Sequence, residues 1–158
     1  MENSKPARKY VTVSAVVIAA CVAAVAKFEG YRAMPYRDTG GVWTVCAGHT
    51  GNDVKPGERW TPEQCEAAMS ADIREAATAV LQCAPGPLTI GQQVAFADFH
   101  YNTGAYCRSS AAKITDVRQS CAVILKYVYV AGKNCNDPAS NCTGIIKRRQ
   151  WEYQTCVS

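Results

Sequence analysis

Glu29, Asp38 and Thr44 lie close together within one stretch, FEGYRAMPYRDTGGVWTVCAGHTG, which runs from Phe28 to Gly51. The two carboxylates are nine positions apart, and six more positions lead to the threonine. Cleaving a glycosidic bond needs a proton donor for the leaving oxygen and a carboxylate that activates water or stabilises the oxocarbenium-like centre. The residue types therefore predict the acid and base of a glycosidase.

The surroundings of the two carboxylates assign their roles. Glu29 follows an apolar run and lies where a helix is expected to end at Gly30, and a carboxyl among apolar side chains favours its protonated form. Asp38 falls in the Gly-rich turn 39–41 and is expected to stay ionised, while Thr44 lies on the short β-run that follows. When the surroundings shift the pKa values of two carboxyl groups apart in this way, the group with the higher pKa is assigned as the acid and the other as the base.

The same stretch resembles the catalytic segment of the T-even phage lysozyme type of muramidase, glycoside hydrolase family 24. The resemblance lies in a glutamate, a nine-residue step, an aspartate in a GG turn, and then W-T-V-C-x-G-H-T. It covers about Lys27 to Cys156 and looks closest to lambdoid endolysins with an uncleaved signal-anchor-release segment. It implies an inverting N-acetylmuramidase without a cofactor, in which Glu29 is the acid and Asp38 and Thr44 hold the water.

The resemblance also implies supporting residues. His49 is expected to pair with Asp72 on the next helix and to orient and stabilise the site rather than act as a base. The amide of Asn102 is expected to line the cleft, with Tyr101 packed beside it. Arg148 or Arg149 is expected to be the basic residue behind the acid, where its positive charge would oppose protonation of Glu29. The alternative is that both arginines lie on a solvated helix face.

The sequence does not assign a role to His100 or to the tryptophans. His100 has no partner that the sequence identifies and is expected to be structural or exposed. The three tryptophans suit a hydrophobic core and a sugar platform equally well: Trp43, Trp60 and Trp151.

The chain of 158 residues is expected to form one domain with a sizeable core. Capping patterns at 61–64 and 89–92 predict helices that run to about Gln82 and towards Tyr101, the second ending near Gly104. Further helices are expected from Ser109 or Ser110, from Asp116 to Ala131 with Gly132 as the cap, and from Ile145 to Cys156. With one β-hairpin region around 36–54, the prediction is an α+β, lysozyme-like fold that is mostly helical and is preceded by an N-terminal apolar helix.

The net charge of +4, from 17 basic and 13 acidic residues, suits approach to an anionic cell wall. The excess is too small and too scattered to indicate nucleic-acid binding. The expected partners are bacterial peptidoglycan and, through the N-terminal segment, the inner membrane. A monomer is expected.

The segment from Tyr10 to Ala26 has 17 residues without a charge, preceded by basic residues at Lys5, Arg8 and Lys9. Such a pattern directs the following chain out of the cytoplasm. The segment is marginal as a spanning helix, for which about 20 apolar residues are usual. It holds six alanines and six valines but no leucine or phenylalanine, so leaving the bilayer should cost little.

Three interpretations of this segment stay open. Ala24-Val25-Ala26 fits the cleavage site of a signal peptide, and Cys21 after Ile18-Ala19-Ala20 fits a lipoprotein signal. The resemblance implies the third and favoured one, in which residues 1–26 are a signal-anchor-release segment and residues 27–158 the catalytic domain. The protein would then be exported, tethered to the inner membrane, and later released into the periplasm. While tethered, Glu29 would be held at the membrane surface.

Nine cysteines are too many for a reducing cytosol and favour export to an oxidising compartment. The sequence has no C-x-x-C and only two histidines, so no metal site is predicted. Spacing and family-like order suggest four disulfides, with Cys21 left over: Cys46–Cys65, Cys83–Cys107, Cys121–Cys156 and Cys135–Cys142.

Cys46 could also take part in activating the enzyme through thiol exchange. It lies two residues after Thr44 on a β-run, so both side chains are expected on one face and close to the cleft. Some members of the resembled family activate by thiol exchange between an anchor cysteine, here Cys21, and a cysteine near the site. The alternative is a plain structural disulfide.

Two rival functions remain. A lytic transglycosylase needs the acid but forms an anhydro product without water, and Asp38 and Thr44 argue against it. A non-catalytic membrane lipoprotein or inhibitor on a lysozyme-like scaffold would be acylated at Cys21, and the intact carboxylate set argues against it.

Overall fold

The computed structural model describes residues 11–38 and 40–158, so expectations that concern Lys5, Arg8, Lys9, Tyr10 or Thr39 lie outside the described residues. The α-helices of the described chain are α1 (Ala15–Glu29), α2 (Pro62–Cys83), α3 (Ile90–Thr103), α4 (Val117–Ala122) and α5 (Gly144–Val157). The strands are β1 (Arg32–Arg37), β2 (Trp43–Cys46), β3 (His49–Thr50), β4 (Tyr129–Val130) and β5 (Lys133–Asn134). Short 3₁₀ turns lie at η1 (Tyr106–Arg108), η2 (Ser110–Lys113), η3 (Ile124–Lys126) and η4 (Pro138–Ser140).

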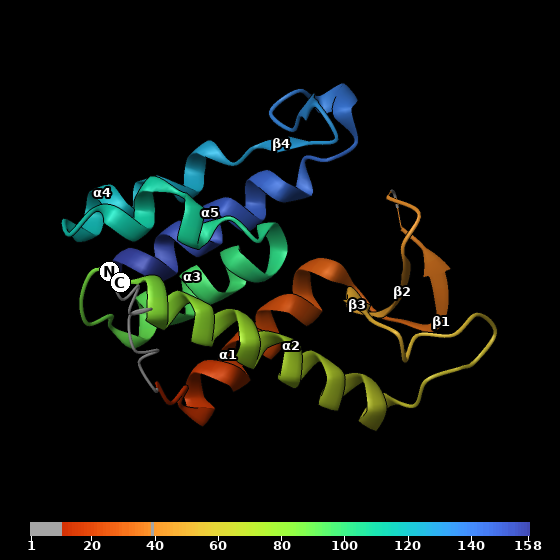
Figure 1. The fold of residues 1–158 in the computed structure, drawn as a ribbon. Coiled ribbons are helices and arrows are strands. Elements are labelled where there is room, and N and C mark those ends of the chain that lie inside the picture. Colours follow the sequence, from red (N-terminus) through yellow and green to blue (C-terminus); the bar gives the residue numbers. More distant parts are fainter. Residues whose placement is uncertain (1–10, 39) are drawn as a thin grey trace, which may run out of the picture.

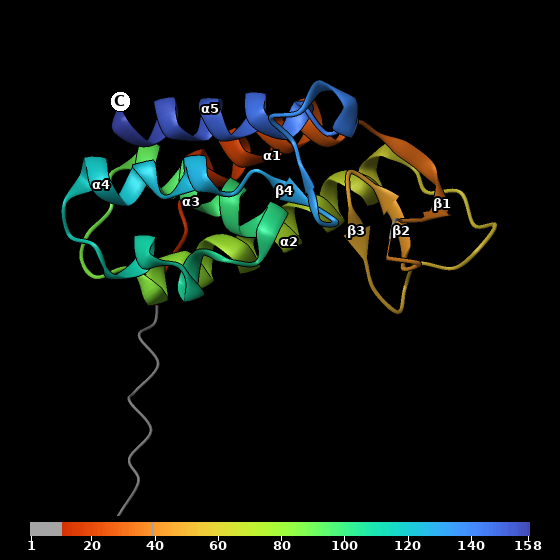
Figure 2. The same cartoon turned by 90° about the horizontal axis from the view of Figure 1, so that it is seen from above.

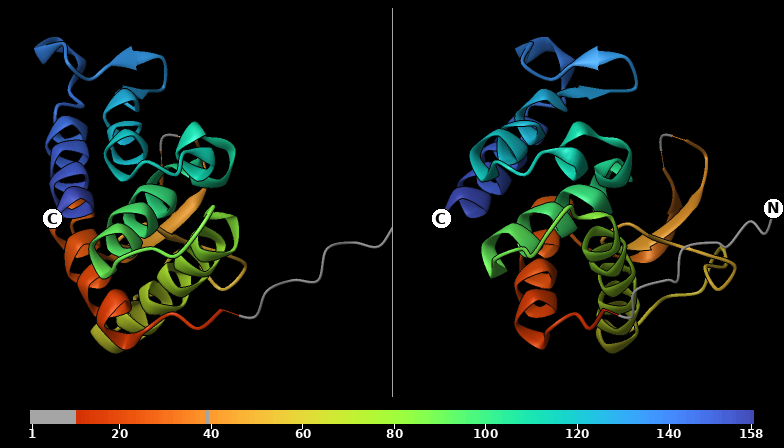
Figure 3. Two further views of the ribbon diagram at one scale, coloured as in Figure 1. Left: turned by 90° about the vertical axis from the view of Figure 1, so that its left-hand side faces the viewer. Right: turned by 60° about the vertical axis from the view of Figure 1, so that its left-hand side comes forward.

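The three-stranded antiparallel sheet β1-β2-β3 lies at one end of the molecule, beside the helices (Figure 1 and Figure 2). Helix α3 is central and packs against α1, α2 and α5. Strands β4 and β5 form a separate hairpin that extends beyond the helical body (Figure 3). The predicted α+β, lysozyme-like and mostly helical architecture is confirmed, and the second hairpin is an addition to it.

Two helices begin with the capping boxes that the sequence predicts. The side chains of Thr61 and Thr89 each accept a hydrogen bond of 3.2 Å, from the backbone N–H of Gln64 and Gln92. The glutamine side chains accept in return from the threonine N–H groups at 2.8 Å. Both boxes satisfy donors that a helix start leaves unpaired, so local sequence fixes where α2 and α3 begin.

The predicted helix from Asp116 to Ala131 is wrong. Helix α4 ends at Ala122, a 3₁₀ turn follows, and the chain then enters β4. Residues 127–130 read Tyr-Val-Tyr-Val, and aromatic and β-branched side chains favour a strand. Gly132, with φ of +78°, turns the β4–β5 hairpin instead of capping a helix. The helix expected from Ser109 or Ser110 is only the 3₁₀ turn η2.

The apolar run of the N-terminal region forms α1, the first helix of the domain. Val17, Ile18, Cys21 and Val25 are buried in a cluster with side chains of α2 and α3. The helix continues without a break to Glu29, where Gly30 ends it with φ of +71°.

Within residues 11–38 and 40–158, no helix has the length and apolar character needed to cross a bilayer.

Four disulfides join the same pairs that the sequence suggests. They connect Cys46 to Cys65, Cys83 to Cys107, Cys121 to Cys156, and Cys135 to Cys142. The bond between α4 and α5 lies inside the larger core cluster, around Phe96, Phe99, Tyr106 and Ile124. Cys21 is free and buried.

Candidate active site

A cleft of about 1080 Å³ lies between the sheet and the helices. Its lining includes all three residues that the sequence proposes for chemistry, and they come from different elements: Glu29 from the end of α1, Asp38 from the β1–β2 turn and Thr44 from β2. The fold therefore brings the candidate acid, the candidate base and the hydroxyl to one concave surface.

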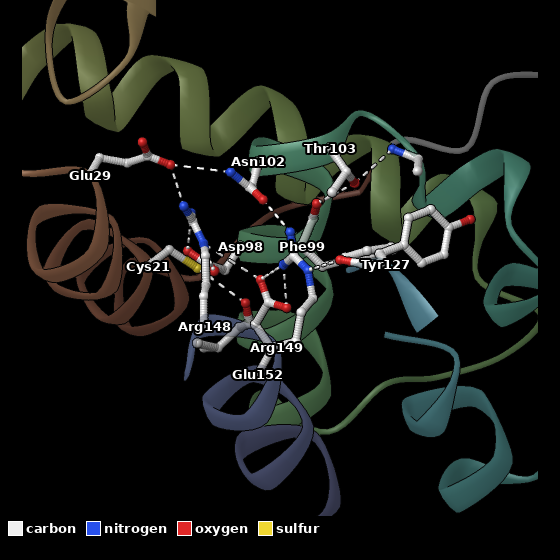
Figure 4. Close-up of polar contacts among 12 residues, drawn as sticks. Cys21, Glu29, Asp98, Phe99, Asn102, Thr103, Tyr127, Arg148, Arg149 and Glu152 are labelled. Atoms are coloured by element: carbon white, nitrogen blue, oxygen red, sulfur yellow. Dashed lines mark hydrogen bonds and ion pairs between the residues drawn. The ribbon is translucent and has the colours of Figure 1, made fainter. Parts of the chain in front are cut away.

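Glu29 is held from the helical side. Its Oε1 accepts a hydrogen bond from the Asn102 amide at 3.2 Å and another from Arg148 Nη1. The Glu29 side chain is 31% exposed, so it remains open to the cleft. Figure 4 shows these contacts reaching the carboxylate from α3 and α5. The preceding Phe28 packs on Trp151 with ring centroids 5.6 Å apart, which fixes the end of α1 against α5.

Asp38 is held by its own turn. Its Oδ1 accepts from the backbone N–H groups of Gly40 at 2.9 Å and Val42 at 2.8 Å. Backbone bonds of 3.0 Å from Asp38 to Val42 and from Gly41 to Asp38 close the turn. Gly41 has φ of +76°, a conformation that glycine adopts without strain. Local geometry thus points a half-buried carboxylate at the cleft.

Thr44 lies in the middle of the sheet and is only 3% exposed. Its neighbours across the sheet are Tyr36 on β1 and Thr50 on β3. The Thr44 hydroxyl donates to the carbonyl of Val42 at 3.1 Å. Because that proton is already used, the hydroxyl oxygen is left to accept a hydrogen bond from a molecule in the cleft.

His49 and Asp72 are paired, as the resemblance implies. His49 Nδ1 lies 2.7 Å from Asp72 Oδ2, and Nε2 lies 3.2 Å from Asp53 Oδ2. Burial opposes protonation of the imidazole, but the hydrogen bonds and charges of Asp72 and Asp53 outweigh it and raise the pKa of His49. The ring also packs on Trp60 at 5.3 Å. This arrangement joins β3 to α2 and places His49 in a supporting position.

Tyr101 and Asn102 are both at the cleft, but their polar atoms are engaged with the protein. The Tyr101 hydroxyl donates to the Ala47 carbonyl at 2.9 Å, and burial raises the pKa of Tyr101. The Asn102 amide donates to Glu29 and its oxygen accepts from Arg149. In this structure Asn102 therefore connects the candidate acid to a buried arginine.

Arg148 and Arg149 are each 2% exposed, which excludes the solvated helix face for both. Arg148 donates to Glu29 and, through Nε at 2.9 Å and Nη2 at 3.0 Å, to both oxygens of Asp98. Arg149 donates to both oxygens of Glu152 at 2.5 Å. Arg148 is thus the cation that contacts the candidate acid Glu29, and Arg149 contacts Glu29 only through Asn102.

Asp98 and Glu152 are site residues that the sequence reasoning missed. Both side chains are fully buried. A signal for Glu152 was present, because it follows Arg148 by four residues and Arg149 by three and so shares their helix face. Asp98 stands alone in the apolar run Ala-Phe-Ala-Asp-Phe, where a buried carboxylate requires a partner.

His100 lines the cleft, and its Nδ1 accepts from the Tyr106 N–H at 3.2 Å. Burial, and then the charge of Arg108, lower the pKa of His100. The tryptophans lie elsewhere: two pack around the Cys46–Cys65 bond and Trp151 lies against Phe28. Besides His100, the aromatic side chains that line the cleft are tyrosines: Tyr36, Tyr101, Tyr127 and Tyr129.

The two cysteines considered for thiol exchange are not bonded to each other in this structure. Cys46 is bonded to Cys65, while the Cys21 thiol lies 3.6 Å from the carbonyl of Val94. Burial, and then Asp98, raise the pKa of Cys21 to about 12. Because the thiol is also fully buried in the core, Cys21 is not placed to react in this fold. Among the described residues, no group of three or more His, Cys, Asp or Glu is arranged to hold a metal ion.

The family model described as Phage lysozyme matches residues 26–152, which include every candidate residue of the cleft. The chain belongs to the phage lysozyme family. Within this family it is similar to the SAR-endolysin of Pseudomonas phage phiKMV, with 32% identity over 147 residues that cover 89% of this chain and 88% of that protein. It is also 32% identical to the SAR-endolysin of Bacteriophage PS119, over 82% of this chain and 76% of the relative.

The lysozyme-like fold of this family is found in solved structures as well. The endolysin from Escherichia coli O157:H7 phage FAHEc1 aligns with a TM-score of 0.75 at 23% identity, over 96% of each chain. At this identity the match supports only the fold of the present phage lysozyme family member. The roles of its residues are inferred from the geometry of the cleft.

Proposed function

We propose that this protein is an endolysin that hydrolyses the β-1,4 bond between N-acetylmuramic acid and N-acetylglucosamine in peptidoglycan. The observation that carries the proposal is the meeting of Glu29, Asp38 and Thr44 in one cleft, with Glu29 bound to a buried arginine. Membership of the phage lysozyme family and similarity to SAR-endolysins support the same reaction and substrate.

The proposed roles follow from the positions of the groups. Glu29 protonates the leaving oxygen of the glycosidic bond. Asp38, held as a half-buried carboxylate by two N–H groups, and the Thr44 hydroxyl hold and activate the water that attacks from the opposite face of the sugar. The anomeric configuration is then inverted. No cofactor takes part.

The test is Glu29→Gln, because the amide keeps the shape of the side chain but cannot donate the proton. A positioned general acid contributes about 10²–10⁴-fold in rate, so clearing of a suspension of exposed cell walls should fall by at least the lower figure. An exposed substitution, Glu66→Gln, changes the charge equally and should leave clearing unchanged. Near wild-type clearing by Glu29→Gln would remove Glu29 from the mechanism.

The released fragments distinguish the rival reactions. Hydrolysis with inversion gives a reducing muramic acid end in the α configuration. An anhydro end would identify a lytic transglycosylase, and retention would make Asp38 a nucleophile. A correctly folded protein that releases no fragments would support the non-catalytic scaffold instead.

We propose further that residues 1–26 are a signal-anchor-release segment and that residues 27–158 form the catalytic domain, whose core α1 completes after release. The names of the relatives support this, and the packing gives a physical reason for control. The apolar side chains of α1 that would lie in the bilayer are those that fill the core against α2 and α3. A tethered protein cannot complete that core or place Glu29, so it stays inactive until α1 leaves the membrane.

The intact mass of the protein from membrane and from soluble periplasmic fractions tests the tether. Retention of residues 1–26 in both fractions supports release without cleavage. A soluble form that starts at Lys27 would indicate a cleaved signal peptide, and a lipid mass on Cys21 would indicate a lipoprotein.

A further inference from the structure

We propose that Glu152 is a positioning residue that governs whether Glu29 carries the proton needed for catalysis, acting through Arg148, Arg149 and Asn102. The inference deepens the proposed function and rests on its assignment of Glu29 as the general acid. A guanidinium favours an ionised carboxylate, whereas a general acid must be protonated. The contact between Arg148 and Glu29 therefore needs a compensating group, and Glu152 is placed to supply it.

The two glutamates are connected by two routes that form a closed ring of polar contacts (Figure 4). On one route, Arg148 donates to Glu29 and its Nε lies 3.6 Å from Glu152 Oε1. On the other, Asn102 donates to Glu29 and accepts from Arg149, which donates to both oxygens of Glu152. The ring spans α1, α3 and α5, so a change of charge at Glu152 reaches Glu29 from two sides.

The charges of this cluster do not balance when every group is ionised. Three carboxyl groups, Glu29, Asp98 and Glu152, share two guanidinium groups. A net charge is costly in a site where four of the five side chains are at most 2% exposed. One proton among the carboxyl groups makes the cluster neutral.

Asp98 is the member least suited to hold this proton, because its two oxygens accept separate hydrogen bonds from Nε and Nη2 of Arg148. Both oxygens of Glu152, in contrast, share the single Nη1 of Arg149. The proton is therefore shared between Glu29 and Glu152. Burial raises the pKa of Glu152, Arg149 opposes this increase, and the neighbouring Asp98 carboxyl adds to it. Glu152 thus has the surroundings of a carboxyl group that can retain a proton near neutral pH.

The two arrangements of the proton differ in activity. With the proton on Glu152, the ionised Glu29 and Asp98 balance the arginines and no general acid is available. With the proton on Glu29, the ionised Glu152 and Asp98 balance the same two charges and the acid is ready. In this arrangement, ionisation of Glu152 promotes protonation of Glu29 through the charges that the two groups share.

The groups that face Glu152 are few. Arg148 and Arg149 belong to its own helix, and Asp98 faces it from α3. From α1, Glu29 reaches the cluster through Arg148, and the Cys21 thiol borders Asp98. The described residues of α4 and η3, which also pack on α5, make no side-chain hydrogen bond or ion pair with Glu152.

The functional test is Glu152→Gln, which keeps the shape and the acceptor for Arg149 but fixes this position as neutral. Glu29 then faces an unbalanced guanidinium charge, so the alkaline limb of the pH–activity profile should move to lower pH by about one unit. On the alkaline side of the profile, where wild-type Glu152 is ionised, kcat should fall several-fold with little change in KM, because the cleft surface is unaltered. Glu66→Gln, which removes the same charge from an exposed position of α2, should leave the profile unchanged. A Glu152→Gln profile that superimposes on the wild type would overturn the proposal.

A second measurement reads the coupling without activity. In protein labelled with ¹³C at the glutamate carboxyl groups, the NMR titration of Glu152 should move to lower pH in Glu29→Gln, because loss of the Glu29 charge leaves Arg148 and Arg149 less balanced. An unchanged Glu152 titration would show that the two sites are independent. This separates the two failures: an active Glu29→Gln variant would refute the proposed acid, while the NMR result judges the coupling by itself.

Discussion

The hydroxyl of Tyr101 donates a hydrogen bond of 2.9 Å to the backbone carbonyl of Ala47, 54 residues away in the sequence. Tyr101 belongs to α3 and Ala47 to the turn between β2 and β3, so the bond joins the two walls of the cleft. It sets the sheet, which carries Thr44, relative to the helix that carries Asn102.

Tyr101→Phe should lower the free energy of unfolding by about 1 kcal/mol, or somewhat more because the Ala47 carbonyl loses its donor. Urea unfolding followed by circular dichroism measures this, and KM for cell-wall fragments should rise as the two walls lose their fixed spacing. If neither quantity changes, the bond does not hold the cleft together.

Asp38→Asn should reduce kcat by about a hundredfold, the lower range for a positioned acid or base. The asparagine oxygen can still accept from Gly40 and Val42, so the turn should persist and the loss reports the missing charge. Thr44→Ser keeps the hydroxyl and should cost little, whereas Thr44→Val removes it and should cost more. Similar small losses for all three variants would place the water elsewhere.

The pair formed by His49 and Asp72 should make stability depend on pH. The pKa of His49 is raised in the folded protein, so its contribution to stability is complete below the unfolded value of about 6.5 and is lost as pH rises through the folded value. His100, whose pKa is lowered, contributes a slope of opposite sign. The readout is therefore the difference in unfolding free energy between wild type and His49→Asn, which should shrink between about pH 6 and pH 8. A constant difference would show that His49 does not titrate with the fold.

Removing the disulfide between Cys121 and Cys156 should destabilise the protein more than removing the bond between Cys135 and Cys142. The first closes a loop with a sequence separation of 35 and the second one of 7, which chain entropy places at roughly 4 and 2 kcal/mol. The first pair also lies in the core. Thermal unfolding of the two paired Cys→Ser variants should rank them in this order, and the reverse order would show that native packing outweighs loop closure.

Leucine at Ala19 and Ala23 should delay release from the membrane. Both positions are exposed on α1 in the folded domain, so leucine there should leave the core intact. Each replacement adds three carbons to the bilayer segment, worth at most about 0.8 kcal/mol per buried CH₂. The membrane-bound fraction should rise and lysis should start later, while glutamine at the same positions should do the opposite. Release of the leucine variant on the wild-type schedule would rule out control by the strength of the anchor.

The sequence predicts well what is decided locally. That Glu29, Asp38 and Thr44 line one cleft is expected from one continuous stretch, although their catalytic roles stay a prediction. The starts of α2 and α3 follow from capping boxes whose partners are three residues apart. These features need no knowledge of distant contacts. For the same reason Gly30 and Gly104 mark helix ends correctly.

Part of what the sequence does not predict depends on contacts between distant segments. Asp98 becomes a site residue only because Arg148, 50 positions later, packs against it. The expected helix over 116–131 fails because the preference of 127–130 for a strand is combined with a hairpin partner at Lys133–Asn134. The Arg148 partner of Asp98 cannot be inferred from spacing along the chain, whereas the hairpin is local and the apolar run over 116–131, taken by itself, favours a helix.

Helix α1 has two apolar faces, although only one of them is packed. Val17, Ile18, Cys21 and Val25 face the core, whereas Val16 remains 62% exposed and Ala19 and Ala23 are exposed as well. A helix that met only water would carry charges on that outer face. Under the proposed release, the outer face contacts lipid before release and water afterwards, whereas the inner face contacts lipid before release and the protein core afterwards. A charged substitution on the outer face would therefore make the folded domain more soluble but would oppose insertion of α1 into the bilayer. The sequence of this helix must therefore suit both lipid and water.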